Sequence, residues 1–249
     1  MKIINVIGKA FCLKKDIASL TIVGVGPGDP SFLTMAALKA IKKAQVIAFP
    51  ISSDDKKSYA AEIVQKYIKF KRKIPIIFPM ARKEFDPNYV WNNAAETIVK
   101  NIRKKNSVVL LCLGDTSLFA SSSNILEIIN KNHPDIVISI VPGISSLSAA
   151  AALGNFDLAK KGETLVVQEC PSTKSQLENL LKKGKDNSVL VLMKVGIRWH
   201  WVRDVLKQED TIKQSLLALN VGMNNQIIEN AIQYKGDKVP YFSLLLIRF

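Results

Sequence analysis

Short apolar runs alternate with longer segments whose apolar residues recur every three or four positions. The runs have the length of strands, whereas the recurring spacing is typical of helices that bury one face. The first half of the chain predicts strands at 20–23, 46–49, 74–78, 108–113 and 136–141, with a helical pattern after each. This alternation predicts a mostly parallel sheet with helices on its faces.

The alternation pauses between 154 and 162 and then resumes. Strand-like runs at 164–168, 189–193, 215–219 and 241–247 are accompanied by helical patterns around 175–182 and 199–206. We therefore predict two α/β domains, at 19–156 and 160–249. Residues 1–18 form an amino-terminal extension, which we expect to be frayed or to add an edge strand.

A glycine-rich turn, Gly24-Val25-Gly26-Pro27-Gly28-Asp29, follows the first strand and precedes the first helix. A dinucleotide-binding loop needs glycines at the first, third and sixth places. Here the sixth place is Asp29 and the fourth is Pro27, so the third glycine is missing and an acid lies where a pyrophosphate would approach. The turn therefore predicts a small-molecule ligand other than a dinucleotide.

Two further loops follow apolar strands in the same way. Gly114-Asp115-Thr116-Ser117 comes after the strand at 108–113, and Pro142–Ser146 comes after the strand at 136–141. Each loop alone is compatible with a plain turn, but the carboxyl ends of parallel strands share one edge of a sheet. We expect the loops to converge on one ligand, with Met193-Lys194-Val195-Gly196 at the equivalent place in the second domain.

The net charge of +14 is the one anomaly of composition. Three interpretations compete: a lysine-rich surface, a nucleic-acid partner, and a polyanionic small substrate drawn into a positive cleft. No nucleic-acid recognition motif is visible, and the basic residues are spread over many predicted helices. Net charge alone does not distinguish between the three interpretations. Since no recognition motif is visible, we expect no nucleic-acid partner.

Apolar runs are too short to cross a bilayer, which requires about 20 residues, and charged residues near the amino terminus interrupt any signal-peptide core. We expect no membrane partner. The three cysteines are odd in number and far apart, which favours a reducing cytoplasm. With His133 and His200 also distant, we expect no metal site. We interpret His133 as a cap at the end of a helix, His200 as a helix-surface residue and Cys112 as a buried hydrophobe.

These motifs resemble those of the tetrapyrrole methylases, the methyltransferases of corrin and sirohaem synthesis that use S-adenosylmethionine. GVGPGDP followed by LT, LCLGDTSLF, VPGISS and VLMK resemble four motifs of the family, and the resemblance runs from about residue 19 to 249. The segments AQVIAFP, FPMARKEF and PYFSLLLIR resemble the subgroup that methylates precorrin-2 at C20. One departure is Thr116, which replaces a proline usual in the second motif.

The resemblance implies a fold of two α/β domains, with a mostly parallel sheet in the first and a mixed sheet in the second. It also implies a homodimer, with S-adenosylmethionine bound in a cleft between the domains. Carried over position by position, it implies that the cofactor is held by Pro27, Leu113, Gly114, Asp115, Leu118, Ser145, Ser146, Met193 and Gly222.

The implied reaction is C20 methylation of precorrin-2 to precorrin-3A in cobalamin biosynthesis. Precorrin-2 carries acetate and propionate arms, and we expect Arg82 and Lys194 to pair with them. A proton must leave after methylation, for which Asp115 and Asp29 are candidates, although we expect Asp115 chiefly to orient its own loop. Asp29 is also a candidate for substrate binding. Cobalt-factor II, RNA and diphthamide remain alternative substrates.

Overall fold

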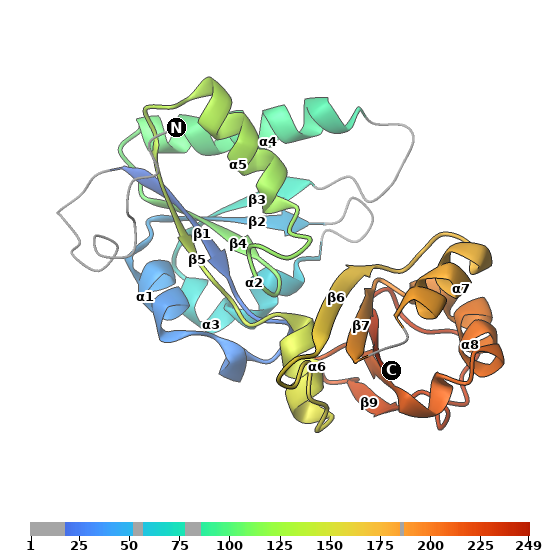
Figure 1. Cartoon of the computed structure of the whole chain (residues 1–249). Helices are drawn as coiled ribbons and strands as arrows, with labels where there is room; N and C mark the ends of the chain where they lie inside the picture. Colours follow the sequence, from blue (N-terminus) through green and yellow to red (C-terminus); the bar gives the residue numbers. More distant parts are fainter. Residues whose placement is uncertain (1–17, 52–56, 78–85, 185–186) are drawn as a thin grey trace. The chain divides into compact units, whose positions relative to one another are not determined.

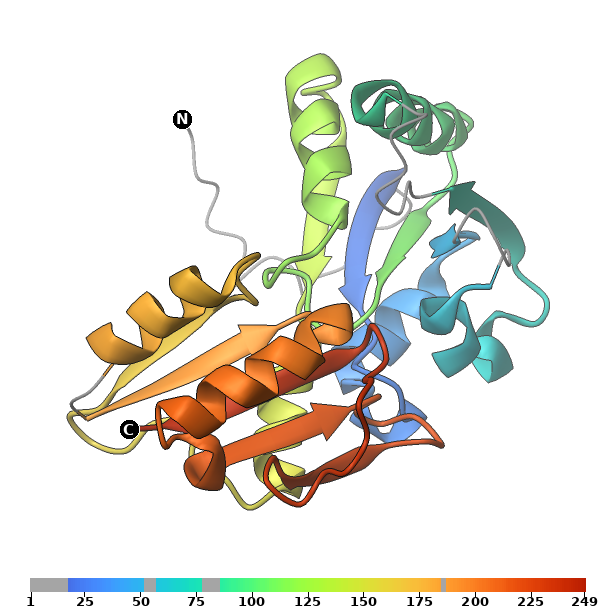
Figure 2. The same ribbon diagram turned by 90° about the vertical axis from the view of Figure 1, so that its right-hand side faces the viewer.

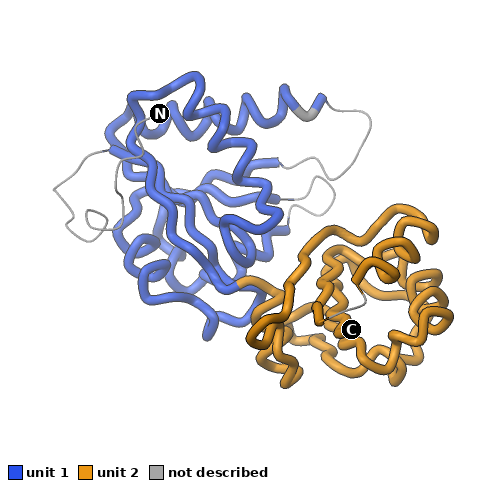
Figure 3. Tube along the Cα trace, in the orientation of Figure 1, with its two compact units in different colours: residues 1–144 blue, residues 145–249 orange. Residues whose placement is uncertain are grey.

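The computed structural model describes residues 18–51, 57–77, 86–184 and 187–249 (Figure 1). The chain divides into two compact units, Met1–Ile144 and Ser145–Phe249 (Figure 3). Of the sequence-based expectations, those for residues 1–17 and for Arg82 lie outside the described residues.

The first unit is built on a five-stranded sheet whose neighbouring strands are all parallel. The strand order is β3-β2-β4-β1-β5. All five residues of β4 are buried, as expected for a strand covered on both faces. The predicted parallel sheet is confirmed, and its strands are β1 (Ser19–Gly24), β2 (Val46–Ile51), β3 (Arg72–Ile77), β4 (Val108–Cys112) and β5 (Val137–Val141).

Helices cover both faces of this sheet (Figure 1). Val108 and Leu110 of β4 share a core with α4 (Pro87–Arg103) and α5 (Ser122–Asn132). The alternate residues Val109 and Leu111 share the opposite core, because side chains of a strand point to the two faces in turn. That core also contains α1 (Met35–Lys43), α2 (Tyr59–Ile63) and α3 (Gln65–Ile68).

One predicted helix differs from the structure. The helical pattern expected after the strand at 46–49 is interrupted, because the backbone leaves helical geometry at Val64 (φ −104°, ψ 10°), which separates α2 from α3. Val64 is fully buried in the core beside α1, so the apolar spacing survives the break in the helix.

The second unit contains a mixed sheet with the order β6-β7-β10-β8-β9. β6 pairs with β7 in parallel, and the other neighbours are antiparallel. The strands are β6 (Thr164–Glu169), β7 (Ser188–Met193), β8 (Ser215–Leu219), β9 (Ile227–Asn230) and β10 (Ser243–Arg248). The mixed sheet is confirmed. The sequence analysis missed β9, a short edge strand with no fully buried residue.

Helices α7 (Lys174–Lys183) and α8 (Trp199–Gln208) lie on one face of this sheet, and α6 (Ser146–Leu153) lies on the other (Figure 2). Gly154 at the end of α6 meets the sheet so closely that an added Cβ would lie 2.3 Å from Leu216 Cδ2. We expected the first domain to extend to residue 156; this boundary stays a prediction, and the compact unit that contains α6 begins at Ser145. Single turns of 3-10 helix occur at Pro30–Phe32, Gly196–Arg198 and Ile212–Gln214.

Trp199 is the largest fully buried side chain that the structure describes, and it lies in the core between α7, α8 and the second sheet. Its indole Nε1 donates a hydrogen bond to the carbonyl oxygen of Gly236 at 3.0 Å. The Tyr234 ring meets it edge-on, with centroids 5.8 Å apart. No helix of the described segments is long and apolar enough to cross a membrane.

We expect Trp199→Ala to lower the free energy of unfolding by about 3–5 kcal/mol, because it leaves a large cavity and an unpaired carbonyl. Trp201→Ala in the same helix is the control: Trp201 is only partly buried against this core, and its loss should cost less than about 2 kcal/mol. Urea unfolding followed by circular dichroism measures both. Equal losses for the two variants would contradict this account of the core.

Candidate active site

Three loops of the first unit meet at the carboxyl ends of β4, β1 and β5, which are neighbours in the sheet. Gly26 and Gly114 exchange two backbone hydrogen bonds, at 3.2 Å and 2.8 Å. The backbone N–H of Gly143 reaches the Asp115 carboxylate at 3.0 Å. The three loops therefore contact one another in the first unit, and their binding of one ligand stays a prediction.

Glycine is required where the three loops touch. A Cβ added to Gly143 would lie 2.2 Å from the carbonyl oxygen of Gly114 and 2.8 Å from Gly24 Cα. A Cβ added to Gly24 would lie 2.5 Å from the nitrogen of Gly143. Real Cβ atoms do not come so close to backbone atoms, so the three backbones pack at a distance that only glycine permits. The sequence analysis assigned no role to Gly24 or Gly143, and a glycine at the end of each strand was the available signal.

The Asp115 carboxylate holds this arrangement together. One carboxylate oxygen accepts two hydrogen bonds, from Ser117 N at 2.8 Å and from the Ser117 hydroxyl. The second carboxylate oxygen accepts a hydrogen bond from Gly143 N. Partial burial raises the pKa of Asp115. The hydrogen bonds from Ser117, Gly143 and Thr116 outweigh it, and the pKa lies below its ordinary value of 3.8. Asp115 thus remains an anion that orients its own loop, and its predicted catalytic role stays a prediction.

Cys112 contacts the loop that contains Asp115, at the point where the chain leaves β4. Its thiol lies within hydrogen-bonding distance of the Asp115 carbonyl oxygen (3.5 Å) and of the Ser122 hydroxyl (3.7 Å). Burial raises the pKa of this thiol, as does the Asp115 charge, although the Ser122 hydrogen bond opposes them. Cys112 is a buried, protonated residue, as predicted. Through Ser122 it joins the end of β4 to the first turn of α5.

The other predicted residues of the first unit border the same loops. Pro27 is buried, and Leu113 and Leu118 are half-buried. Gly114 differs from Gly24 and Gly143: an added Cβ would meet nothing within 4 Å, so one side of this residue is open. Asp29 is exposed and accepts a hydrogen bond from Ser31 N at 2.7 Å, which lowers its pKa. Its observed contact is thus a local cap.

The predicted residues of the second unit lie at strand ends and a helix start. Met193 ends β7 and Lys194 follows it. Gly222 comes after β8, which runs in the same direction as β7 because both are antiparallel to β10. Lys194 pairs with Glu169 at the end of β6. Ser145 caps α6 by accepting a hydrogen bond from Ser148 N at 3.2 Å, and Ser146 is the first residue of that helix.

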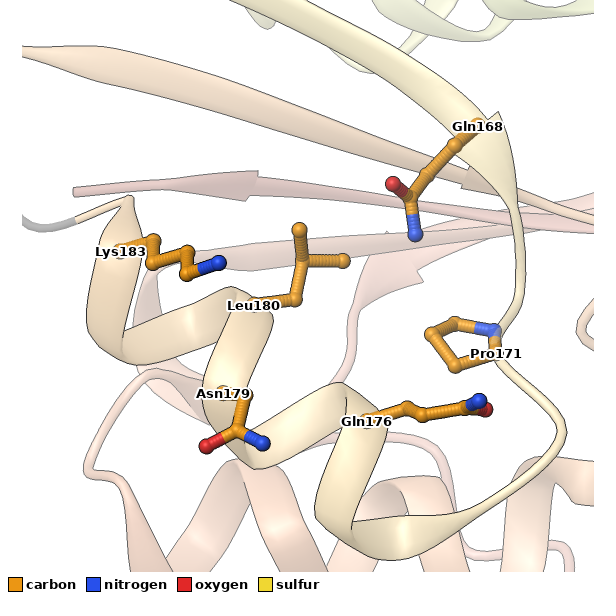
Figure 4. A pocket seen from close by; sticks show the side chains of 6 residues that line it. All are labelled: Gln168, Pro171, Gln176, Asn179, Leu180 and Lys183. Carbon is orange, nitrogen blue, oxygen red and sulfur yellow. The ribbon is translucent and has the colours of Figure 1, made fainter.

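A separate hollow of about 370 Å³ lies between α7 and the end of β6 in the second unit (Figure 4). None of the predicted site residues lines it; its lining residues are Gln168, Pro171, Gln176, Asn179, Leu180 and Lys183. In the part of the chain that is described, no group of three or more His, Cys, Asp or Glu side chains is placed to hold a metal ion. His133 ends α5 and contacts Glu96 at 2.7 Å, and His200 is exposed.

Comparison with known families assigns most of the chain to one family. The family model of the tetrapyrrole (corrin/porphyrin) methylases matches residues 19–232. The chain belongs to the tetrapyrrole methylase family. The resemblance carried by the sequence motifs is thus confirmed, and the protein is a methyltransferase. The glycine loops at the ends of β1 and β4 lie inside the matched range.

Curated relatives align along most of the chain at low identity. A precorrin-2 C(20)-methyltransferase from a Sinorhizobium species is 25% identical over 93% of this chain and 95% of its own length. A cobalt-precorrin-2 C(20)-methyltransferase from Salmonella typhimurium is 26% identical over 92% and 95%. A probable cobalt-precorrin-2 C(20)-methyltransferase from Methanocaldococcus jannaschii is 34% identical, but the match spans only 58% of this chain and 61% of that relative.

Solved structures of other methyltransferases share the fold. A cobalt-precorrin-4 methyltransferase matches with a TM-score of 0.70 at 18% identity, over 94% of this chain and 96% of that chain. A uroporphyrin-III C-methyltransferase from Thermus thermophilus, in complex with S-adenosylhomocysteine, matches with a TM-score of 0.62 at 17% identity, over 92% and 96%. The predicted α/β fold is confirmed.

We expect Gly143→Ala to cost about 3 kcal/mol or more of unfolding free energy, because its Cβ would collide with two backbones. Gly114→Ala is the matched control. Gly114 has φ +74° but open space, so that variant should pay only the left-handed strain of about 1–2 kcal/mol. Thermal and urea unfolding measure both. A Gly143 variant as stable as the Gly114 variant would contradict the close packing.

We expect the stability that Asp115 contributes to depend on pH. A carboxyl whose pKa is lowered by folding stabilises fully above its ordinary value of 3.8, and that stabilisation is lost as the pH falls through the lower folded value. The difference in unfolding free energy between wild type and Asp115→Asn should thus be largest at neutral pH and shrink below about pH 3.8. Ser117→Ala should move the loss to higher pH. A pH-independent difference would contradict the assignment.

Proposed function

We propose that this protein transfers a methyl group from S-adenosylmethionine to C20 of precorrin-2, giving precorrin-3A in cobalamin biosynthesis. The observation that carries the proposal is the set of glycine loops joined by Asp115 at the sheet edge of a tetrapyrrole methylase. Alignment along nearly the whole chain with relatives named C(20)-methyltransferases of precorrin-2 and cobalt-precorrin-2 supports this substrate.

The residues at the loops fit a cofactor of this kind. A Cβ on Gly114 would meet no atom within 4 Å, so there is free space beside this residue, while Gly24 and Gly143 pack against its carbonyl oxygen. We propose that Pro27, Leu113, Gly114, Asp115 and Leu118 hold the cofactor, together with Ser145, Ser146, Met193 and Gly222 from the second unit. S-adenosylmethionine, when bound, supplies an already activated methyl group.

The role of the chain in this chemistry is therefore chiefly placement. Holding donor and acceptor in contact and aligned can supply up to about 7–11 kcal/mol of a barrier. Asp115 has both carboxylate oxygens occupied and a lowered pKa, which makes it a weak proton acceptor. We propose that it is a positioning residue, which keeps the Gly114 backbone rigid while the acceptor is methylated.

The positive charge suits a substrate rich in carboxylates. We propose that Arg82 and Lys194 pair with the acetate and propionate arms, with Lys194 exchanging its Glu169 partner for substrate. Asp29 stays a proposed substrate contact near the first loop. From the family resemblance we also propose that the protein works as a cytoplasmic homodimer.

A methyl-transfer assay tests the proposed function. Purified protein is mixed with labelled S-adenosylmethionine and, in separate reactions, with precorrin-2 and with its cobalt-containing forms. We expect a gain of one methyl group, detected by mass and absorbance, and the productive substrate distinguishes the metal-free from the cobalt route. No transfer to either tetrapyrrole would overturn the proposal, and transfer to RNA or to diphthamide precursors would replace it.

A separate substitution tests the proposed cofactor site. We expect Gly114→Ala to weaken S-adenosylhomocysteine binding at least about tenfold by calorimetry, because the new methyl group takes space that the ligand needs. Gly162→Ala is the control: it has φ +85°, its Cβ would meet only Asn187 Nδ2 at 3.8 Å, and it precedes β6. Equal affinities in the two variants would contradict the placement of the cofactor.

A further inference from the structure

Phe119 has a backbone conformation that its side chain disfavours. Seven described residues other than glycine have a positive φ, and Phe119 (φ 50°) is the only apolar one among them. The other six are lysine, asparagine or aspartate residues: Lys105, Asn155, Asn187, Lys194, Asp210 and Asn220. A bulky side chain in this region is a true outlier, and such outliers gather at functional sites.

The Phe119 side chain is also exposed, at 43% of its surface, although burial of a phenylalanine is favourable. It lies in the loop between β4 and α5, four positions after Asp115. A chain of four residues spans at most about 14 Å. Phe119 therefore lies within about 14 Å of Asp115, in the same loop that we propose contacts the cofactor.

The loop is fastened on both sides of Phe119. Before it, Asp115 is tied to Ser117 and Gly143. After it, the Ser123 hydroxyl donates to the carbonyl oxygen of Ala120, and Ser122 contacts Cys112 in β4. The strained backbone at Phe119 thus lies between two segments that hydrogen bonds hold in place.

We propose that Phe119 binds the substrate by packing its ring against the flat face of the tetrapyrrole; this inference rests on the proposed function. Methyl transfer requires donor and acceptor carbons in contact, at about 3–3.5 Å. A residue beside the cofactor loop therefore borders the acceptor as well. The macrocycle offers a broad apolar π surface, to which aromatic rings bind by stacking or edge contact.

Binding of the two ligands, measured separately, tests the role of the ring. The variants are Phe119→Ala, Phe119→Gly and Phe119→Tyr, with Phe70→Ala as control. Phe70 is 93% exposed in the first unit, but it lies between α3 and the start of β3, at the other end of the strands. Precorrin-2 affinity is measured by absorbance titration with S-adenosylhomocysteine present, and affinity for S-adenosylhomocysteine is measured alone by calorimetry.

We expect Phe119→Ala and Phe119→Gly to weaken precorrin-2 binding about tenfold and to raise its KM similarly. Phe119→Tyr and Phe70→Ala should stay within about twofold of wild type. Affinity for S-adenosylhomocysteine should stay within about twofold in every variant. Because glycine accepts a positive φ, Phe119→Gly should melt at a higher temperature than Phe119→Ala while binding tetrapyrrole equally poorly.

Three results would overturn the inference. Wild-type precorrin-2 affinity in both Phe119→Ala and Phe119→Gly would show that the ring makes no contact with the substrate. Restored affinity in Phe119→Gly but not in Phe119→Ala, or loss of both ligands together, would make the residue a determinant of loop shape alone. If the wild-type protein methylates tetrapyrrole, these results overturn only the role of Phe119. If the wild-type protein neither binds nor methylates tetrapyrrole, the proposed function is overturned as well.

Discussion

The first unit depends on three backbones that lie closer together than any side chain permits. Gly24, Gly114 and Gly143 each follow or end one of three adjacent strands, and a Cβ on Gly24 or Gly143 would overlap the others. The missing side chains let Asp115 reach across to Gly143 N, so one carboxylate closes the contact. The Gly114 backbone groups are bonded to Gly26, and the space where a Gly114 Cβ would lie is free of other atoms.

The order of the strands is one that favours ligand binding at this edge. β1 lies between β4 and β5, and the helices that follow β1 and β4 pack on opposite faces: α1 in the core with Ile47, and α5 in the core with Leu110. The chain therefore leaves two neighbouring strands in opposite directions. Such a point in a parallel sheet is where ligands of α/β proteins bind.

The features that could be predicted from the sequence depend on residues that are neighbours in the chain. Apolar runs fixed the position of nearly every strand, and the glycine loops at strand ends pointed to one edge. The features that were missed depend on partners distant in the chain. The need for glycine at position 143 comes from the carbonyl of Gly114. β9 has too little buried apolar surface to stand out as a strand before its pairing with β8 is known.

Positive φ angles also gather where the strands end. Gly26 and Gly114 have φ of +80° and +74° in the first unit, and Lys194 and Gly222 have +57° and +77° in the second. For a residue with a side chain such a conformation costs about 1–2 kcal/mol, and a stable core must offset it. Strain at Phe119 and Lys194 is thus tolerated because hydrogen bonds fix the loops around them. A reaction whose methyl donor is already activated gains most from rigid placement, and this edge of the fold provides rigidity.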